Sequence, residues 1–230
     1  MTNLSYSDMY ELLSAIPLFR GVGGDDLGLI LDRANLRRVT VERGEPIVMQ
    51  GDACRNLIVV LSGRVRVVTQ SVRNDYSLVE WIDEVHTIEL EQLYGLQQRY
   101  ARTYEADTEV VCLVVSKDDV RRTLMGINIW RINLLNALST AQARYRDMAI
   151  EALGDSLEEQ IYHFVRLRAL TQYGPKQLTI TMATLGRYTN SSRVVVSNAL
   201  HRLREKGRIE MKAGEIGFAS LEAFQPQSST

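Results

Sequence analysis

A short run of side chains near the end of the chain combines the residue types that read DNA. Residues 192–198 contain a guanidinium, an amide, hydroxyls and aliphatic groups. Arginine can pair with guanine and asparagine with adenine through two hydrogen bonds each, and an aliphatic group can contact a thymine methyl. The candidate base contacts are Ser192, Arg193, Val194, Ser197 and Asn198.

The residues around this run predict a winged helix-turn-helix. Residues 178–180 alternate as a short strand does, and Thr181 can cap a first helix that begins at Met182. The polar run 189–192 breaks that helix and offers caps for a second one that ends near Glu205. The second helix has one apolar stripe, made of Val196, Ala199, Leu200 and Leu203.

A hairpin is expected after the second helix. Gly207 can end the helix, and residues 208–218 alternate on either side of a turn at 212–214, which forms the wing. Caps and basic residues of such modules hold phosphates. The candidate phosphate contacts are therefore Thr181, Ser191 and Lys212.

Two alternatives to DNA reading stay open at this stage. The same elements could form a plain helical bundle with a hairpin, or a winged helix that binds another protein. Affinity for DNA that falls steeply with salt separates these cases, because counterion release follows phosphate contacts.

Composition and charge fit a globular protein with a basic end. The 230 residues are 45% hydrophobic, which is enough for one large or two ordinary domains. From Ser156 onward the chain has ten Lys or Arg against six Asp or Glu, although its net charge is only −1. No run approaches the roughly 18 apolar residues of a membrane span, and we expect a soluble, cytoplasmic protein without a membrane partner.

The middle of the chain predicts a β domain followed by a long helix. Residues 35–115 contain many short β-branched runs between glycine turns, which is typical of a sandwich or barrel. Residues 117–151 predict one long helix, with or without a short helix that ends near Gly126. The apolar stripe of this region is Ile127, Trp130, Leu134, Leu138, Ala141, Tyr145 and Met148.

The best domain boundary lies at Gly154 and Asp155. Ser156 and Glu159 have the spacing of a capping box, so the next helix begins there. We expect a sensing domain at 1–123, a helix and hinge at 124–154, and a DNA-binding domain at 155–230. The fold class is α+β.

The sequence offers no set of residues for catalysis or for a metal site. The histidines, His86, His163 and His201, lie in three different segments, and no nucleophile, base and orienting group come together. Cys54 and Cys112 are too few for a disulfide framework or an iron–sulfur cluster. We expect neither an enzyme nor a metal site.

The whole order resembles the Crp/Fnr family of bacterial transcription regulators. Residues 16–21 look like the opening segment of that family, Gly44, Gly51 and Gly63 have the spacing of its β-roll glycines, and Arg193 stands where its recognition helix commonly reads guanine. The resemblance implies an N-terminal β-roll (a double-stranded jelly roll), a long dimerisation helix and a C-terminal winged helix-turn-helix. It also implies a homodimer on a pseudo-palindromic site in double-stranded DNA, and RNA polymerase as a partner. The residues expected at the dimer helix are Trp130, Leu134, Leu138, Ala141 and Tyr145.

The cyclic-nucleotide cassette of that family is degenerate here. Leu96 stands where the resemblance implies a ribose-binding glutamate, and Tyr100 stands where it implies a phosphate-binding arginine. A buried phosphate needs a cation and donors in fixed geometry, so we expect no tight binding of cyclic AMP. The candidate pocket for an unidentified small-molecule effector is Tyr94, Arg99 and Arg102.

No cofactor is predicted. Haem is the one alternative left open, because His86, Cys54, Cys112 or a methionine could ligate its iron. No spacing singles any of them out.

Overall fold

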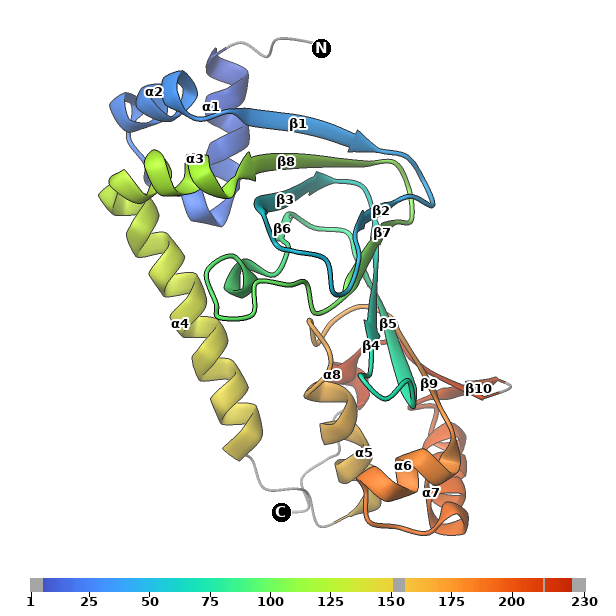
Figure 1. Ribbon diagram of the computed structural model, residues 1–230. Coiled ribbons are helices and arrows are strands. Elements are labelled where there is room, and N and C mark those ends of the chain that lie inside the picture. Colours follow the sequence, from blue (N-terminus) through green and yellow to red (C-terminus); the bar gives the residue numbers. More distant parts are fainter. Residues whose placement is uncertain (1–5, 151–155, 213, 225–230) are drawn as a thin grey trace. The chain divides into compact units, whose positions relative to one another are not determined.

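The computed structural model describes residues 6–150, 156–212 and 214–224 (Figure 1). The chain divides into two compact units. The first unit contains the residues up to 64 together with 83–101 and 106–144, and the second contains 65–82, 102–105 and the residues from 145 onward. The mixed helix and strand content confirms the expected fold class.

An antiparallel sheet forms the centre of the first unit. Its strands β1 (Leu36–Val41), β8 (Val110–Ser116), β3 (Asn56–Ser62) and β6 (His86–Thr87) follow in that order. Strand β2 is Pro46–Val48. Gly63 ends β3 at φ 91°, and a Cβ there would lie 2.2 Å from the Glu109 carbonyl oxygen, so only glycine fits this turn.

Helices precede and follow the strands of the first unit. The helices α1 (Tyr6–Ala15), η1 (Pro17–Phe19) and α2 (Gly24–Arg33) come first, and η2 (Leu90–Gln92) follows β6. After β8 come α3 (Lys117–Arg122), η3 (Leu124–Gly126) and the long α4 (Asn128–Ile150). The short helix that ends near Gly126 is therefore confirmed.

The first turns of α4 are anchored in the core of the first unit. Trp130 is fully buried and meets the Phe19 ring edge to face, with ring centroids 6.4 Å apart. The Asn133 amide donates to the carbonyl oxygens of Leu18 and Arg20 at 3.2 and 2.8 Å. These contacts fix the helix by apolar burial and by two hydrogen bonds at once.

The second unit carries the winged helix-turn-helix predicted from the sequence. Its C-terminal elements are α5 (Leu157–Arg166), β9 (Lys176–Ile180), α6 (Met182–Tyr188), α7 (Arg193–Glu205), β10 (Glu210–Lys212), β11 (Glu215–Phe218) and α8 (Leu221–Phe224). Strands β4 (Val65–Gln70), β5 (Tyr76–Ile82) and β7 (Thr103–Ala106) complete its sheet, in the order β10-β11-β9-β5-β4-β7.

The β4–β5 hairpin comes from the middle of the chain but pairs with the winged helix (Figure 1). Strand β5 runs antiparallel to β9 from Tyr76 opposite Ile180 to Glu80 opposite Lys176. Leu78 of β5 is fully buried in the same apolar core as Leu200 of α7. This division of the chain differs from the expected domains, in which the hairpin belonged to the sensing part. The expected boundary at 154–155 lies outside the described residues.

A buried ion pair joins β5 to β9. Lys176 Nζ lies 3.5 Å from Glu80 Oε1, and both side chains are at most 1% exposed. The ammonium also donates to the carbonyl oxygens of Tyr173 and Gly174, and the carboxylate accepts from the amide nitrogens of Leu170 and Thr171. Burial lowers the pKa of Lys176, and the attraction of Glu80 offsets part of that shift.

Removing one member of this pair should cost far more than removing both charges. Lys176→Met leaves the Glu80 carboxylate buried without its cation, and we expect the free energy of unfolding to fall by about 3–5 kcal/mol. The double variant Glu80→Gln/Lys176→Met should lose clearly less, because no charge is stranded. Urea unfolding followed by circular dichroism measures both. Equal losses in the two variants would contradict a functioning ion pair.

Candidate nucleic-acid interface

The Thr181 hydroxyl caps the start of helix α6. This hydroxyl accepts a hydrogen bond from the Thr184 amide nitrogen at 3.1 Å and donates to Thr184 Oγ1 at 2.9 Å. The cap explains why the helix begins at Met182. It also means that Thr181, a candidate phosphate contact, has its only side-chain donor engaged within the helix start.

The turn between α6 and α7 depends on a close backbone approach. The Ser191 amide nitrogen donates to the Gly186 carbonyl oxygen at 2.8 Å, and Asn190 adopts φ 49°. A Cβ on Gly186 would lie 2.5 Å from the Ser191 carbonyl oxygen. Sequence reasoning did not single out Gly186, although a glycine inside a short helix is a signal of close packing. The Ser191 hydroxyl donates to the Thr189 carbonyl oxygen at 3.1 Å, so the turn also uses this candidate phosphate contact.

Helix α7 buries the predicted stripe and leaves its first turn open. Val196, Ala199, Leu200 and Leu203 are buried as expected, and Ser192 caps the helix by accepting from the Val195 amide nitrogen at 3.4 Å. Arg193 and Asn198 are exposed, Ser197 is half-buried, and Val194 is 67% exposed.

An exposed valine accompanies the candidate base contacts and was missed from the sequence. Val195 is 50% exposed, next to Val194. Two adjacent exposed valines are unusual in water, and each offers a methyl surface of the kind that contacts thymine. The first two turns of α7 therefore present a guanidinium, an amide and two aliphatic groups.

Basic side chains at the C-terminal part of α7 are used inside the unit. Glu158 of α5 accepts from Arg202 Nε at 3.2 Å and from Lys206 Nζ at 3.0 Å. Burial alone would raise the pKa of Glu158, but the hydrogen bonds from Lys206 and Arg202 outweigh it and lower the pKa. These two cations hold the C-terminal end of α7 against α5.

The wing exposes the third candidate phosphate contact. Lys212 ends β10 with its side chain 80% exposed, 3.8 Å from the equally exposed Glu210. An exposed pair of this kind holds its members weakly. Lys212 can therefore turn its ammonium to a phosphate at little cost.

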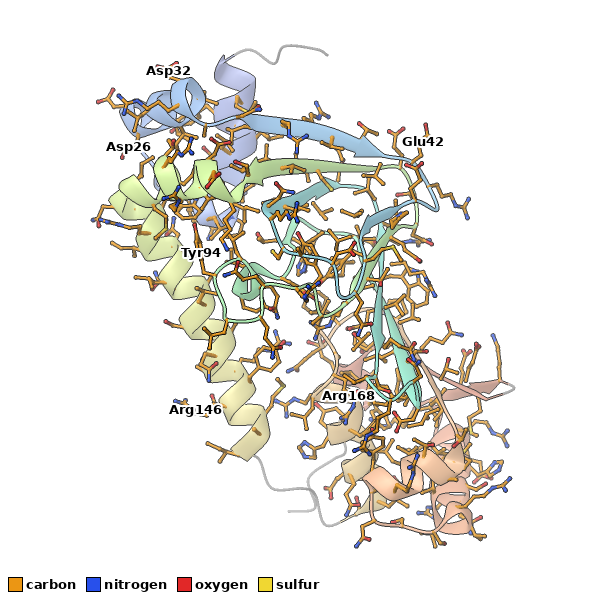
Figure 2. All side chains as sticks on the ribbon, in the orientation of Figure 1. Asp26, Asp32, Glu42, Tyr94, Arg146 and Arg168 are labelled. Atoms are coloured by element: carbon orange, nitrogen blue, oxygen red, sulfur yellow. The ribbon has the colours of Figure 1, made fainter. Side chains whose placement is uncertain are left out.

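Arg168 packs against three aromatic rings next to α6. The Arg168 guanidinium lies 3.7 Å from the centroid of the Phe164 ring, and the rings of Tyr76 and Tyr188 lie 5.0 and 5.1 Å away. Figure 2 marks Arg168 within the second unit. Stacking on three rings ties α5, α6 and β5 to one cation.

The candidate effector residues are spread over both units and have partners within the chain. Leu96 is fully exposed, and Tyr94, marked in Figure 2, is 41% exposed with the Lys117 ammonium 5.1 Å from its ring centroid. Arg99 Nη1 donates to the Gly51 carbonyl oxygen at 2.7 Å. Arg102 belongs to the second unit, where its Nε donates to Thr69 Oγ1 at 3.0 Å.

A buried glutamate in this segment was missed from the sequence. Glu89 is 3% exposed, adopts φ 36°, and accepts from the Ala101 amide nitrogen at 2.6 Å. Tyr100, at the position of the expected arginine, is 5% exposed; burial raises the pKa of its phenol, and a hydrogen bond with Cys54 adds to the shift. The Tyr100 side chain is therefore neutral at ordinary pH.

The expected dimer residues of α4 divide into two sets. Trp130 and Leu134 are buried, whereas Leu138 and Ala141 are half-buried and Tyr145 is exposed. The exposed apolar face instead contains Ile132 and Leu135, which are 44% and 61% exposed. Trp130 and Leu134 are buried because they fix α4 to the first unit. Helical periodicity alone does not distinguish such a role from a role in a dimer interface.

Two of the candidate haem ligands, His86 and Cys112, are the cross-strand neighbours of Val60 in the sheet of the first unit. Cys54 and Cys112 are buried free thiols, and burial raises the pKa of Cys112 to about 11. His86 lies in β6, opposite Val60. Within the described ranges, no group of three or more His, Cys, Asp or Glu side chains is placed to hold a metal ion. No helix in the same ranges is both long and apolar enough to cross a membrane.

Comparisons with known proteins agree with this arrangement. Residues 38–126 match the cyclic nucleotide-binding domain family. The cyclic AMP receptor protein of Thermus thermophilus is 24% identical over 201 residues, which cover 87% of this chain and 91% of that protein. The crystal structure of the Thermus thermophilus catabolite activator protein is 22% identical, covers 90% of this chain and 96% of its own, and gives a TM-score of 0.50.

A second structure agrees over a similar length. A protein described as a transcriptional regulator of the Crp/Fnr family from Eubacterium rectale is 18% identical, with coverage of 92% and 99% and a TM-score of 0.54. The fold is that of the Crp/Fnr transcription regulators, with a cyclic nucleotide-binding domain in its first half. The resemblance predicted from the sequence is thereby confirmed.

Proposed function

We propose that this chain is a sequence-specific DNA-binding transcription regulator and not an enzyme. The observation that carries the proposal is the first two turns of α7, which are capped by Ser192 and expose Arg193, Val194 and Asn198. A helix that offers its N-terminal residues in this way can enter the major groove and meet base edges. The basic excess of the C-terminal region, ten Lys or Arg against six Asp or Glu, favours a polyanionic partner.

The proposed regulator acts as a homodimer on a pseudo-palindromic site. Ile132 and Leu135 expose apolar surface on one face of α4, and the half-buried Leu138 follows one turn after Leu135. Apolar residues at spacings of three and four along a long helix form a seam with a second helix. Two-fold symmetry in the protein then requires two half-sites about one helical turn apart.

The proposed sensor does not bind cyclic nucleotides tightly. A cyclic phosphate needs a fixed cation, but the arginine position holds the neutral, buried Tyr100, and Arg99 is engaged with Gly51. Glu89 ties the segment to Ala101, which favours a closed cassette. The effector is another small molecule, and RNA polymerase is the proposed protein partner of the DNA-bound dimer.

Selection of genomic fragments by the purified full-length protein tests the DNA-binding function. We expect enrichment of a two-fold-symmetric motif, with an affinity that falls steeply as salt rises. Binding without sequence preference, or without salt dependence, would contradict the proposal and favour a winged helix that serves a protein partner.

Arg193→Ala and Lys212→Ala should separate base reading from phosphate binding. We expect Arg193→Ala to cost about 1–3 kcal/mol on the enriched site and to relax specificity at one position, because a bidentate base contact is lost. Lys212→Ala should weaken all sequences alike. Fluorescence anisotropy with the enriched duplex and a scrambled duplex measures both. Equal losses of Arg193→Ala on the two duplexes would remove it from the base contacts.

Leu135→Glu should convert the dimer into a monomer. A carboxylate in an apolar seam is buried without a partner, which costs several kcal/mol per site. Light scattering coupled to gel filtration gives the mass. Thr140→Glu is the matched control, since Thr140 is exposed on the far side of α4 from Leu135. A dimer that survives Leu135→Glu would place the interface elsewhere.

Calorimetric titration with cyclic AMP and with cyclic GMP should give no tight binding. The physical reason is the missing cation at Tyr100. The variant Tyr100→Arg supplies that cation as a comparison. Micromolar affinity of the unmodified protein for either nucleotide would show that the cassette opens and that our interpretation of it is wrong.

A further inference from the structure

The β4–β5 hairpin is built into the DNA-binding unit as firmly as the wing itself. Its strand β5 covers the edge of β9 that faces away from the wing, so the sheet has a hairpin on each side of β9. The buried pair of Glu80 and Lys176 fixes the register of that contact. A one-residue slip of β5 would turn Glu80 to the other face of the sheet and leave Lys176 without its partner, so the pair favours this register alone.

The tip of the hairpin is preorganised. Ser71 Oγ donates to Asp75 Oδ1 at 2.6 Å and accepts from the Asp75 amide nitrogen at 3.0 Å. Asn74 adopts φ 53°, and its amide nitrogen donates to the Ser71 carbonyl oxygen. The Tyr188 hydroxyl of α6 donates to Asp75 Oδ2 at 3.2 Å, which fastens the tip to the helix-turn-helix. The turn is therefore rigid before it meets any partner.

Strand registers place this tip at the same end of the sheet as the wing turn and the start of α6. Tyr76, directly after the tip, lies opposite Ile180, and Glu215, directly after the wing turn, lies opposite Thr179. Both turns therefore lie at the end of β9 where Thr181 starts α6. One surface hollow is lined by the tip, by the start of α6 and by the wing, with Asn74, Asp75, Thr181, Met182 and Gly214 among its residues.

The outermost side chains of the tip suit a nucleic-acid backbone or groove. Val72 is 98% exposed and Arg73 is exposed beside it. The Asp75 carboxylate, which would repel phosphates, is hydrogen bonded to Ser71 and Tyr188 and lies 3.8 Å from the Arg187 guanidinium. Arg73 is thus the cation that a rigid turn holds outward at this end of the sheet.

We propose that the β4–β5 hairpin is a second wing, whose Arg73 contacts a DNA phosphate while α7 reads the major groove. The inference rests on the proposed DNA-binding function and extends it to a segment about a hundred residues earlier in the chain. Residues 65–82, which form this hairpin, belong to the second unit and not to the first. The partner of the hairpin tip is the phosphate backbone of the same duplex that α7 reads.

The salt dependence of operator binding tests this contact. Arg73→Ala should weaken binding to the enriched duplex and to a scrambled duplex alike, and should reduce the slope of log affinity against log salt by about 1 per protomer. Arg43→Ala is the matched control, because Arg43 is another exposed turn arginine but lies in the first unit. It should leave affinity and slope unchanged.

Site-directed DNA cleavage provides a second measurement that does not depend on loss of affinity. Cys54 and Cys112 are buried, so a single cysteine in Val72→Cys can be labelled selectively with an iron chelate in the folded protein. We expect cleavage at discrete positions of the enriched duplex, and background cleavage only from the same chelate on Arg43→Cys.

The outcomes separate failure of the second wing from failure of the proposed function. If the unmodified protein selects no motif, the DNA-binding function itself is wrong. If it binds its motif but Arg73→Ala keeps the original salt slope, the second wing is overturned. A reduced slope without localised cleavage from Val72→Cys also overturns it, since Arg73 would then act on DNA only through the fold.

Discussion

The pairing of β5 with β9 is the contact on which the second unit depends. A sheet edge exposes unpaired N–H and C=O groups, and β5 satisfies those of β9 along the register from Tyr76 to Glu80. The Glu80–Lys176 pair then makes this register unique, because buried charges tolerate no displacement from their partners. With the register fixed, Leu78 enters the core beneath the helix-turn-helix and Tyr76 reaches the cage around Arg168.

Internal hydrogen bonds and ion pairs also determine which side chains are available on the surface proposed to meet DNA. Thr181 and Ser191 use their hydroxyl donors within the cap and the turn, so they position backbone rather than present free donors. Arg202 and Lys206 are held by Glu158. The surface proposed to meet DNA consists of the first two turns of α7 and the two hairpin turns at one end of the sheet. Specificity and phosphate binding are thus assigned to different elements of one rigid unit.

The first unit combines the frame of the β-roll with a cassette segment that departs from the pattern expected from the resemblance. Gly63 still makes the close approach that the β-roll requires, and α4 is still anchored through Trp130 and Asn133. The segment from Glu89 to Ala101 is tied to itself, and its phenol at position 100 is neutral. The effector proposed for this unit is therefore a ligand that suits these groups.

The sequence by itself determined the local elements and the class of fold. The cap at Ser192, the break after Tyr188 and the stripe from Val196 to Leu203 are local signals, because caps and helical spacing depend on neighbours within a few residues. Only the tertiary structure decided which face of α4 is buried, that Gly186 meets Ser191, and that residues 65–82 join the winged helix. These features arise from contacts between residues far apart in the chain, as between Glu80 and Lys176. An alternating strand pattern shows which side is apolar, but it does not show which strand will be its neighbour.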